Sequence, residues 1–453
     1  MKFVNKFNLL ALLLALSLVL TACPAPAAAP AGDSGSDDAA ASEDSGDAEA
    51  EEGDAEAGDA EEGDAAAGGC EDELGCVEVA DGDTINVAGM LAASGPVAFL
   101  GEDSQGGIEI AIAERGEIMG HELNLTIEDS TCNAEGGQTA AQKVAADPSI
   151  VGVVGTNCSG AAAAALPVLS EAGLVLISPS NTSPWLTNPD PDDGGLWAPG
   201  YYRTAHNDLF QGAIAAAYAY NELGARTIAT VHDGDPYTDG LQGAFADAFV
   251  ELGGEITYQG AVNKGDTDMR PILTELASSP PDILYFPLFE PEVNFMAAQS
   301  VEFPELEETT LMGADAALVE SFPENTGDAA DGMYLSGPYL TPEGPYGDFL
   351  TKWDEEYGGT PPSGFHAHAY DATNMLLDAI EAVATEDGNG GLLIGRQAIR
   401  DALTAIDGFE GLTGVLTCDE YGDCATGEAL GIFQITASEI DDDNWPPEVI
   451  WVP

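Results

Sequence analysis

The sequence contains few basic residues. Eleven Lys and Arg stand against 80 Asp and Glu in 453 residues, which gives a formal net charge of −69. Nucleic acid and anionic lipid headgroups would be repelled by such a surface, so we expect neither as a partner. Only six of these basic residues are Arg, and they are scattered along the chain. Because phosphate, sulfate and dicarboxylate sites usually use Arg, their shortage favours a zwitterionic or neutral ligand.

The signatures of an enzyme and of a metal site are also missing. No G-x-S-x-G surrounds Ser159, and no CxxC spacing occurs. His366 and His368 are two residues apart, so on a helix they would point to different faces and would suit a metal only in an extended segment. The acidic runs at residues 419–423 and 441–443 lack EF-hand spacing and are more typical of solvated loops. We therefore expect no enzymatic activity, no metal and no cofactor.

The chain also lacks an apolar run long enough to span a membrane near its start. Residues 9–20 form a short apolar run after Lys2 and Lys6, and Leu20-Thr21-Ala22-Cys23 follows. This order is typical of an export signal. The last four residues resemble the bacterial lipoprotein signal, in which the Cys becomes the lipidated first residue. We predict a signal peptide at residues 1–22 and a membrane anchor at Cys23, the alternative being a plain secretory signal.

Residues 24–69 have no aromatic residue and no aliphatic residue larger than Ala. Such a segment cannot bury enough apolar surface to offset its chain entropy, and its like charges keep it extended. We predict a disordered acidic tether over residues 23–69. The tether holds 15 acidic and no basic residues, so the 65 acidic and nine basic residues from Cys70 onward leave a net charge of −56 there. That surface would suit a high-salt medium, where ions screen its self-repulsion.

Residues 151–187 carry the most informative pattern. An apolar run at 151–154 ends in a polar turn before Ser159, an Ala-rich helical stretch follows, and a second apolar run at 174–177 ends in the hydroxyl-rich turn 178–182. This order predicts a β/α unit with two buried parallel strands. Strand ends that present Ser and Thr beside a helix start suit a small anionic group such as a carboxylate. The alternative is that Ser159 and Thr182 only cap helices and form turns.

Strand-like and helix-like segments alternate from residue 84 to residue 313, which predicts parallel sheets with right-handed crossovers. The pattern starts again near Asp208 without a long linker, so we expect two similar lobes joined by short hinge strands. About 380 residues follow the tether, which is enough for two lobes. A return of the chain to the first lobe would account for a long helix at 370–384 and final strands at 431–435 and 449–452.

Several motifs together resemble one known family. They are residues 93–101, 129–133, 157–159 and 177–184, then Arg203-Thr204 with Asp208 and Gln211-Gly212, and Asp235-Pro236-Tyr237 with Gly240. Between about residues 84 and 437 the chain resembles the leucine/isoleucine/valine-type amino-acid-binding proteins of ABC importers, which are type I periplasmic binding proteins. The resemblance implies two Rossmann-like α/β lobes joined by three hinge crossings. We assign residues 70–207 plus about 339–429 to lobe 1, and 208–338 plus about 430–453 to lobe 2.

The resemblance also implies a set of ligand-binding residues. Ser159 and Thr182 would donate hydrogen bonds to the ligand carboxylate, and the carbonyl group of Ser180 would face the ammonium. Asp315 would be the acidic partner of the ammonium, in a position where Glu is usual. It could instead cap a helix. The other expected wall residues are Tyr237, Phe289 and Leu100, and Asp208 is a weaker candidate for an indirect role.

Six Cys remain besides Cys23, an even number in an oxidising compartment. Six Cys allow fifteen pairings, although Cys70 with Cys76 and Cys418 with Cys424 are close enough for small local loops. The resemblance implies a third disulfide, Cys132–Cys158.

We predict a monomeric, exported solute-binding lipoprotein that closes its lobes around an amino acid with a branched-chain or other apolar side chain. It would deliver this ligand to the permease subunits of an ABC importer. The alternatives are the same fold binding urea, short amides or aromatic acids, or acting as a sensory receptor domain.

Overall fold

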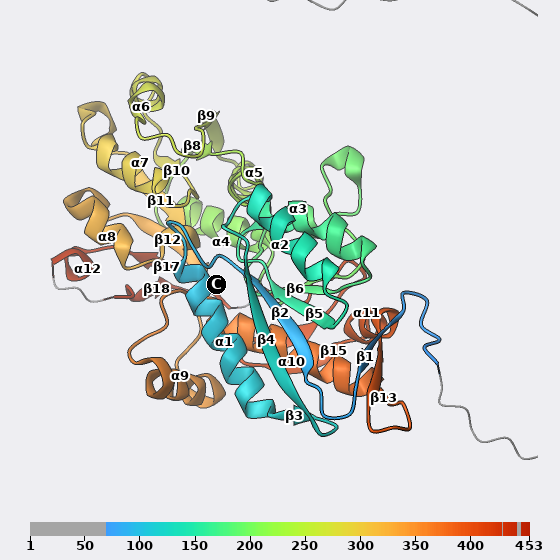
Figure 1. Cartoon of the computed structure of the whole chain (residues 1–453). Coiled ribbons are helices and arrows are strands. Elements are labelled where there is room, and N and C mark those ends of the chain that lie inside the picture. The colour runs from blue at the N-terminus through green and yellow to red at the C-terminus, as the bar shows by residue number, and fades with distance from the viewer. Residues whose placement is uncertain (1–68, 428, 442–444) are drawn as a thin grey trace, which may run out of the picture. The chain divides into compact units, whose positions relative to one another are not determined.

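The computed structural model describes residues 69–427, 429–441 and 445–453 (Figure 1). The predicted signal peptide, the lipidation site Cys23 and nearly all of the predicted tether lie outside these residues. In the described ranges, no helix combines the length and the hydropathy that a membrane crossing needs.

Two large sheets organise the fold (Figure 1). The six-stranded sheet of the first lobe has the order β3 (Glu117–Ile118), β4 (His121–Asp129), β2 (Ile85–Leu91), β5 (Ile150–Gly155), β6 (Leu176–Ser178) and β7 (Tyr201–Arg203). The seven-stranded sheet of the second lobe has the order β18 (Val449–Trp451), β17 (Leu430–Gln434), β12 (Tyr334–Pro338), β11 (Thr310–Ala314), β10 (Ile283–Tyr285), β8 (Thr227–His232) and β9 (Glu255–Ala261).

Both sheets are parallel over most of their width and carry antiparallel edge strands, which the alternation of strands and helices did not indicate. β3 pairs antiparallel with β4, because only two residues separate them and a parallel pair needs a long crossover. β17 pairs antiparallel with β12, and β18 pairs with β17, so these final strands belong to the sheet of the second lobe and the return to the first lobe does not account for them. β12 ends where the chain leaves the second lobe and β17 begins where the chain returns to it, so the two strands run in opposite directions.

Helices cover both faces of each sheet, and the strands are therefore apolar on both faces. In β2, Ile85 and Val87 belong to a core that includes residues of α1 and α10, whereas Ala88 and Met90 belong to a core that includes residues of α2 and α3. The helices of this lobe are α1 (Phe99–Arg115), α2 (Ala134–Ala146), α3 (Ser159–Glu171), α9 (Gly344–Tyr357), α10 (His366–Val383) and α11 (Arg396–Thr404).

The second lobe follows the same plan. Residues of α4 and α5 form a core with one face of its sheet, and residues of α6, α7 and α8 form a core with the other face. Its helices are α4 (Asp208–Asn221), α5 (Pro236–Glu251), α6 (Arg270–Ala277), α7 (Glu292–Ser300), α8 (Ser321–Thr326) and α12 (Ala437–Asp441).

The chain passes between the sheets three times, after β7, after β12 and after β16 (Gly414–Thr417). Two small sheets were not predicted. β1 (Cys76–Val79), β14 (Leu392–Gly395) and β13 (Thr385–Glu386) form one, and β16 forms a hairpin with β15 (Asp407–Gly411). Three disulfides form, Cys70–Cys76, Cys132–Cys158 and Cys418–Cys424. They confirm both local loops and the pairing that the family resemblance implied.

Two helical glycines give a matched test of this packing. A Cβ on Gly107 of α1 would lie 2.2 Å from the carbonyl oxygen of His366 at the start of α10, whereas a Cβ on Gly243 of α5 would meet nothing within 4 Å. We expect Gly107→Ala to lower the free energy of unfolding by about 2 kcal/mol and Gly243→Ala to raise it by about 0.5–1 kcal/mol. Urea unfolding of both variants measures this, and equal effects would contradict the packing described.

Candidate functional site

On the first-lobe side, Asn157 holds together the loops that surround the site. It follows β5, and its amide nitrogen donates hydrogen bonds to the carbonyl of Leu100 at 3.0 Å and to Ser104 Oγ at 2.8 Å. Its amide oxygen accepts one from the backbone N–H of Ala92 at 2.8 Å, and its backbone carbonyl accepts one from Ser180 Oγ at 3.1 Å. Because Asn157 is buried and its amide is bonded on both sides, it fixes these loops relative to one another.

Ser159 is the first residue of α3 and is buried, with Oγ 3.3 Å from the backbone N–H of Ser183. The first N–H groups of a helix have no partner within the helix, and the helix dipole favours negative charge there. This end of the site therefore suits a carboxylate, as the sequence predicted.

On the second-lobe side, Asp315 follows β11 and begins a short 3₁₀ turn, Asp315–Ala317. Its Oδ1 accepts a hydrogen bond from Gln211 Nε2 at 2.7 Å and another from the hydroxyl of Tyr237 at 3.1 Å. Burial raises the pKa of Asp315 above that of an ordinary aspartate, and these two donors limit the rise. Both donors are neutral, so they leave the negative charge of the ionised form without a counter-charge.

A small enclosed cavity joins the two sides. Its volume is about 10 Å³, which is room for about one water molecule. An amino acid can therefore enter only if the lobes separate or side chains move. The cavity is lined by Leu100, Asn157, Ser159, Ser180, Tyr237, Phe289, Asp315, Ala316 and Phe365.

This lining brings together six of the seven ligand-binding residues predicted from the sequence. The exception is Thr182, which is buried but does not line the cavity. Its carbonyl accepts a hydrogen bond from the backbone N–H of Asp208 at 2.9 Å. Thr182 therefore lies behind the residues that form the cavity wall, next to the first crossing between the lobes.

Asp208 is fully buried, and its carboxyl oxygens have no hydrogen-bond partner of ordinary geometry among the described residues. Burial, and after it the negative charge of Asp315, raises the pKa of Asp208 well above its ordinary value, although the Thr182 side chain and Arg203 act to lower it. A cation bound near both carboxyl groups would favour the ionised form of each.

The two lobes touch each other beside the cavity. Ser183 Oγ donates a hydrogen bond to the carbonyl of Pro236 at 2.8 Å. A Cβ on Gly160 would lie 2.4 Å from Asp235 Oδ2, so glycine allows the close approach of Asp235 to the start of α3. Asp235 also forms an ion pair with Lys264, at 2.6 Å. Sequence reasoning did not single out Lys264, which lies 5.9 Å from the ring centre of the cavity residue Phe289.

A buried ion pair supports the loop that carries Ser180 and Thr182. Arg203 is fully buried and donates hydrogen bonds to both carboxylate oxygens of Asp423, at 2.9 and 2.7 Å. Its Nη1 also donates to the carbonyls of Asn181 at 3.2 Å and Ser183 at 2.8 Å. Asn207 Nδ2 donates to Asp423 Oδ2 at 2.7 Å, so the first crossing is tied to the disulfide loop Cys418–Cys424.

The histidines of the H-x-H pair have separate partners. His366 Nδ1 lies 3.0 Å from Asp103 Oδ1, and its Nε2 lies 2.7 Å from the hydroxyl of Tyr346. His368 Nδ1 lies 2.9 Å from the carbonyl of Thr204, and burial lowers the pKa of His368 to about 4. In the part of the chain that the structure describes, no three His, Cys, Asp or Glu side chains gather as metal ligands would. Of the second acidic run, residues 442 and 443 lie outside the described residues.

Sequence reasoning missed Gln211, Ala316 and Phe365 as individual site residues, and it used Asn157 only as part of a motif. A polar residue directly after a buried strand was a usable signal for Asn157. Phe365 carried no local signal, because it reaches the site from the loop before α10.

A family model described as periplasmic binding protein matches residues 84–438. The Leu/Ile/Val-binding protein homolog 1 of Brucella abortus is 27% identical over 337 residues, which cover 74% of this chain and 85% of that protein. The leucine-, isoleucine-, valine-, threonine-, and alanine-binding protein of Pseudomonas aeruginosa is 26% identical over 373 residues, covering 81% of this chain and 92% of that protein.

Solved structures show the same fold. A leucine binding protein, LivK, from Thermotoga maritima superposes with a TM-score of 0.69 at 25% identity, covering 78% of this chain and 96% of that chain. LivJ from Streptococcus pneumoniae, in complex with isoleucine, has a TM-score of 0.67 at 24% identity, covering 81% and 99%. A solute binding protein from R. palustris, in complex with benzoate, has a TM-score of 0.65 at 19% identity, covering 78% and 93%.

The buried ion pair makes a specific prediction. Asp423→Asn leaves the guanidinium of Arg203 buried without its counter-charge, so we expect the free energy of unfolding to fall by about 3 kcal/mol. Glu420→Gln, in the same disulfide loop but exposed, should change it by less than about 0.5 kcal/mol. Denaturant unfolding of both variants with the disulfides intact measures the difference, and a similar small effect of both would show that the pair does not stabilise the fold.

Proposed function

The chain belongs to the family of periplasmic binding proteins, and we propose that it captures an amino acid with an apolar side chain between its two lobes. Proteins of this family bind solutes and are not enzymes. We further propose that the ligand is delivered to the permease of an ABC importer.

The observation that carries this proposal is the composition of the small cavity. Ser159 and the start of α3 provide donors on the first-lobe side, and Asp315 provides a carboxylate on the second-lobe side. A free amino acid is a zwitterion, and both of its charged ends need partners once water is expelled. Donors at one end and a carboxylate at the other meet that need, because charge-assisted hydrogen bonds are the stronger ones.

The names of the relatives support a branched-chain or similar apolar ligand. They bind leucine, isoleucine and valine by name, and LivJ was solved with isoleucine. The wall residues Leu100 and Phe289 offer apolar surface to such a side chain.

The benzoate complex of a structural relative favours an aromatic acid as the second candidate. The charge of the residues that line the small cavity argues against an aromatic acid as the ligand. Among the described lining residues of the small cavity, Asp315 is the one charged side chain, and it is acidic. A carboxylate ligand without an ammonium would place two negative groups together with no compensating charge.

A ligand that contacts both lobes stabilises the closed arrangement through contacts that the open one lacks. We propose that the permease recognises the two lobe surfaces in this closed arrangement, and that the protein acts as a monomer. The proposed lipid on Cys23 would hold it outside the cytoplasm, and three disulfides are typical of such a compartment.

Removing the charge of Asp315 tests the ammonium site. We expect Asp315→Asn to weaken leucine binding at least 100-fold, about 2.7 kcal/mol, because a buried ammonium would lose its counter-charge. Asp239→Asn, on α5 and about half exposed, should leave the affinity within twofold. Isothermal titration calorimetry on both variants decides, and a loss of less than threefold for Asp315→Asn would show that the ammonium binds elsewhere.

The raised pKa of Asp315 predicts a pH dependence. A bound ammonium favours the ionised carboxylate, so the affinity should be constant at high pH and should fall as the pH drops through the pKa of Asp315. Because burial raises that pKa, the fall should begin at a higher pH than an ordinary aspartate would give. Titrations between about pH 8 and pH 4.5 measure it. An equal fall in Asp315→Asn would assign the pH dependence to another group.

A further inference from the structure

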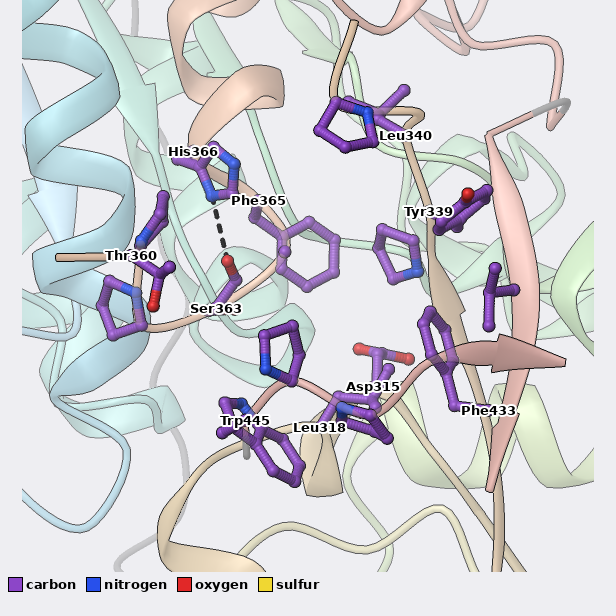
Figure 2. A pocket seen from close by; sticks show the side chains of 18 of the residues that line it. Asp315, Leu318, Tyr339, Leu340, Thr360, Ser363, Phe365, His366, Phe433 and Trp445 are labelled. Atoms are coloured by element: carbon purple, nitrogen blue, oxygen red, sulfur yellow. Dashed lines mark hydrogen bonds between the residues drawn. The ribbon is translucent and has the colours of Figure 1, made fainter. Parts of the chain in front are cut away.

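A second and much larger cavity adjoins the small one (Figure 2). We call it the apolar chamber. Its volume is about 510 Å³, and it shares two of its lining residues, Asp315 and Phe365, with the small cavity. Figure 2 shows the ring of Phe365 and the carboxyl group of Asp315 facing the same space. These two side chains therefore form a common wall between the cavities.

The rest of the chamber is built from flat apolar groups. Six prolines and five aromatic residues line it, together with Leu318, Leu340, Leu350 and Val449. Aromatic rings and proline rings offer faces against which another ring can stack. The aromatic members are Tyr339, Tyr346, Phe365, Phe433 and Trp445.

The charged and titratable groups of the chamber are few. Besides the hydroxyls of Tyr339 and Tyr346, these groups are Asp315, Glu448 and His366 among the described lining residues. His366 is already engaged with Asp103 and Tyr346. Glu448 is exposed at the rim. Asp315 is thus placed to hold an ammonium at the point where the small cavity meets the chamber.

The sizes of the two cavities indicate how they would be used together. The small cavity has room for about one water molecule, whereas the chamber is within the range of about 300–1,000 Å³ typical of ligand pockets. A leucine side chain would leave most of the chamber empty. Phe365, from the loop before α10, lines both cavities and so lies at the place where a ligand would pass from one into the other.

We infer that the preferred ligand is an amino acid with an aromatic side chain, which extends past Phe365 into the apolar chamber while its ammonium binds Asp315. This inference rests on the proposed function, since it places the side chain of an amino acid bound in the small cavity.

Filling the chamber tests the inference. We expect the purified protein to bind phenylalanine or tryptophan at least tenfold more tightly than leucine in calorimetric titrations. Leu340→Trp, which adds a further large ring to the chamber wall, should weaken phenylalanine binding at least tenfold and leave leucine binding within twofold. Leu350→Trp, from α9, fills the chamber from another side and should act in the same way. Val250→Trp, exposed near the far end of α5, controls for an added indole, and thermal melting confirms that each variant is folded.

The outcomes separate the two proposals. If leucine binds and the aromatic amino acids bind no more tightly, the chamber inference is overturned while the proposed function stands. The chamber inference is also overturned if phenylalanine binds tightly and neither chamber-filling variant weakens its binding. The ring of phenylalanine would then lie outside the chamber. Binding of none of these amino acids overturns the proposed function and the inference with it.

Discussion

The structure depends on one electrostatic constraint, a carboxylate placed between two lobes with only neutral donors around it. Asp315 accepts hydrogen bonds from Gln211 and Tyr237, and the nearby Asp208 is fully buried and has no hydrogen-bond partner of ordinary geometry among the described residues. Burying charge without a counter-charge is costly, so this region is incomplete until a cation arrives. In the proposed function, the ammonium of an amino acid would supply that charge, and its carboxylate would meet donors on the opposite lobe. Recognition and lobe closure would then have the same physical cause.

Two sets of buried contacts hold the first-lobe side of the site in place. Arg203 and Asp423 compensate each other and hold the loop that carries Ser180, while the amide of Asn157 ties the loop after β5 to Ala92 and to the start of α1. These contacts fix the donors of the first lobe before a ligand binds. Binding energy is then not used to order them.

Much of the fold was predictable because the strands are buried on both faces and the helices between them are long. The predicted strands 431–435 and 449–452 lie within one residue of β17 and β18. Helix starts were harder to predict: α10 begins at His366 and not at residue 370. Six of seven predicted site residues meet in one cavity because three follow the carboxyl ends of first-lobe strands and three follow the carboxyl ends of second-lobe strands. Phe365 and the apolar chamber could not be predicted, because tertiary packing alone joins segments from residue 315 to residue 449.

The central claim is that the site requires both charges of an amino acid. Thermal melting of the purified protein in high salt tests it most directly, with leucine, leucinamide, 4-methylpentanoate and urea compared at equal concentrations. The account predicts that leucine raises the midpoint increasingly with concentration, while leucinamide, which lacks the carboxylate, and 4-methylpentanoate, which lacks the ammonium, raise it far less. A rise with 4-methylpentanoate or urea equal to that with leucine would contradict it.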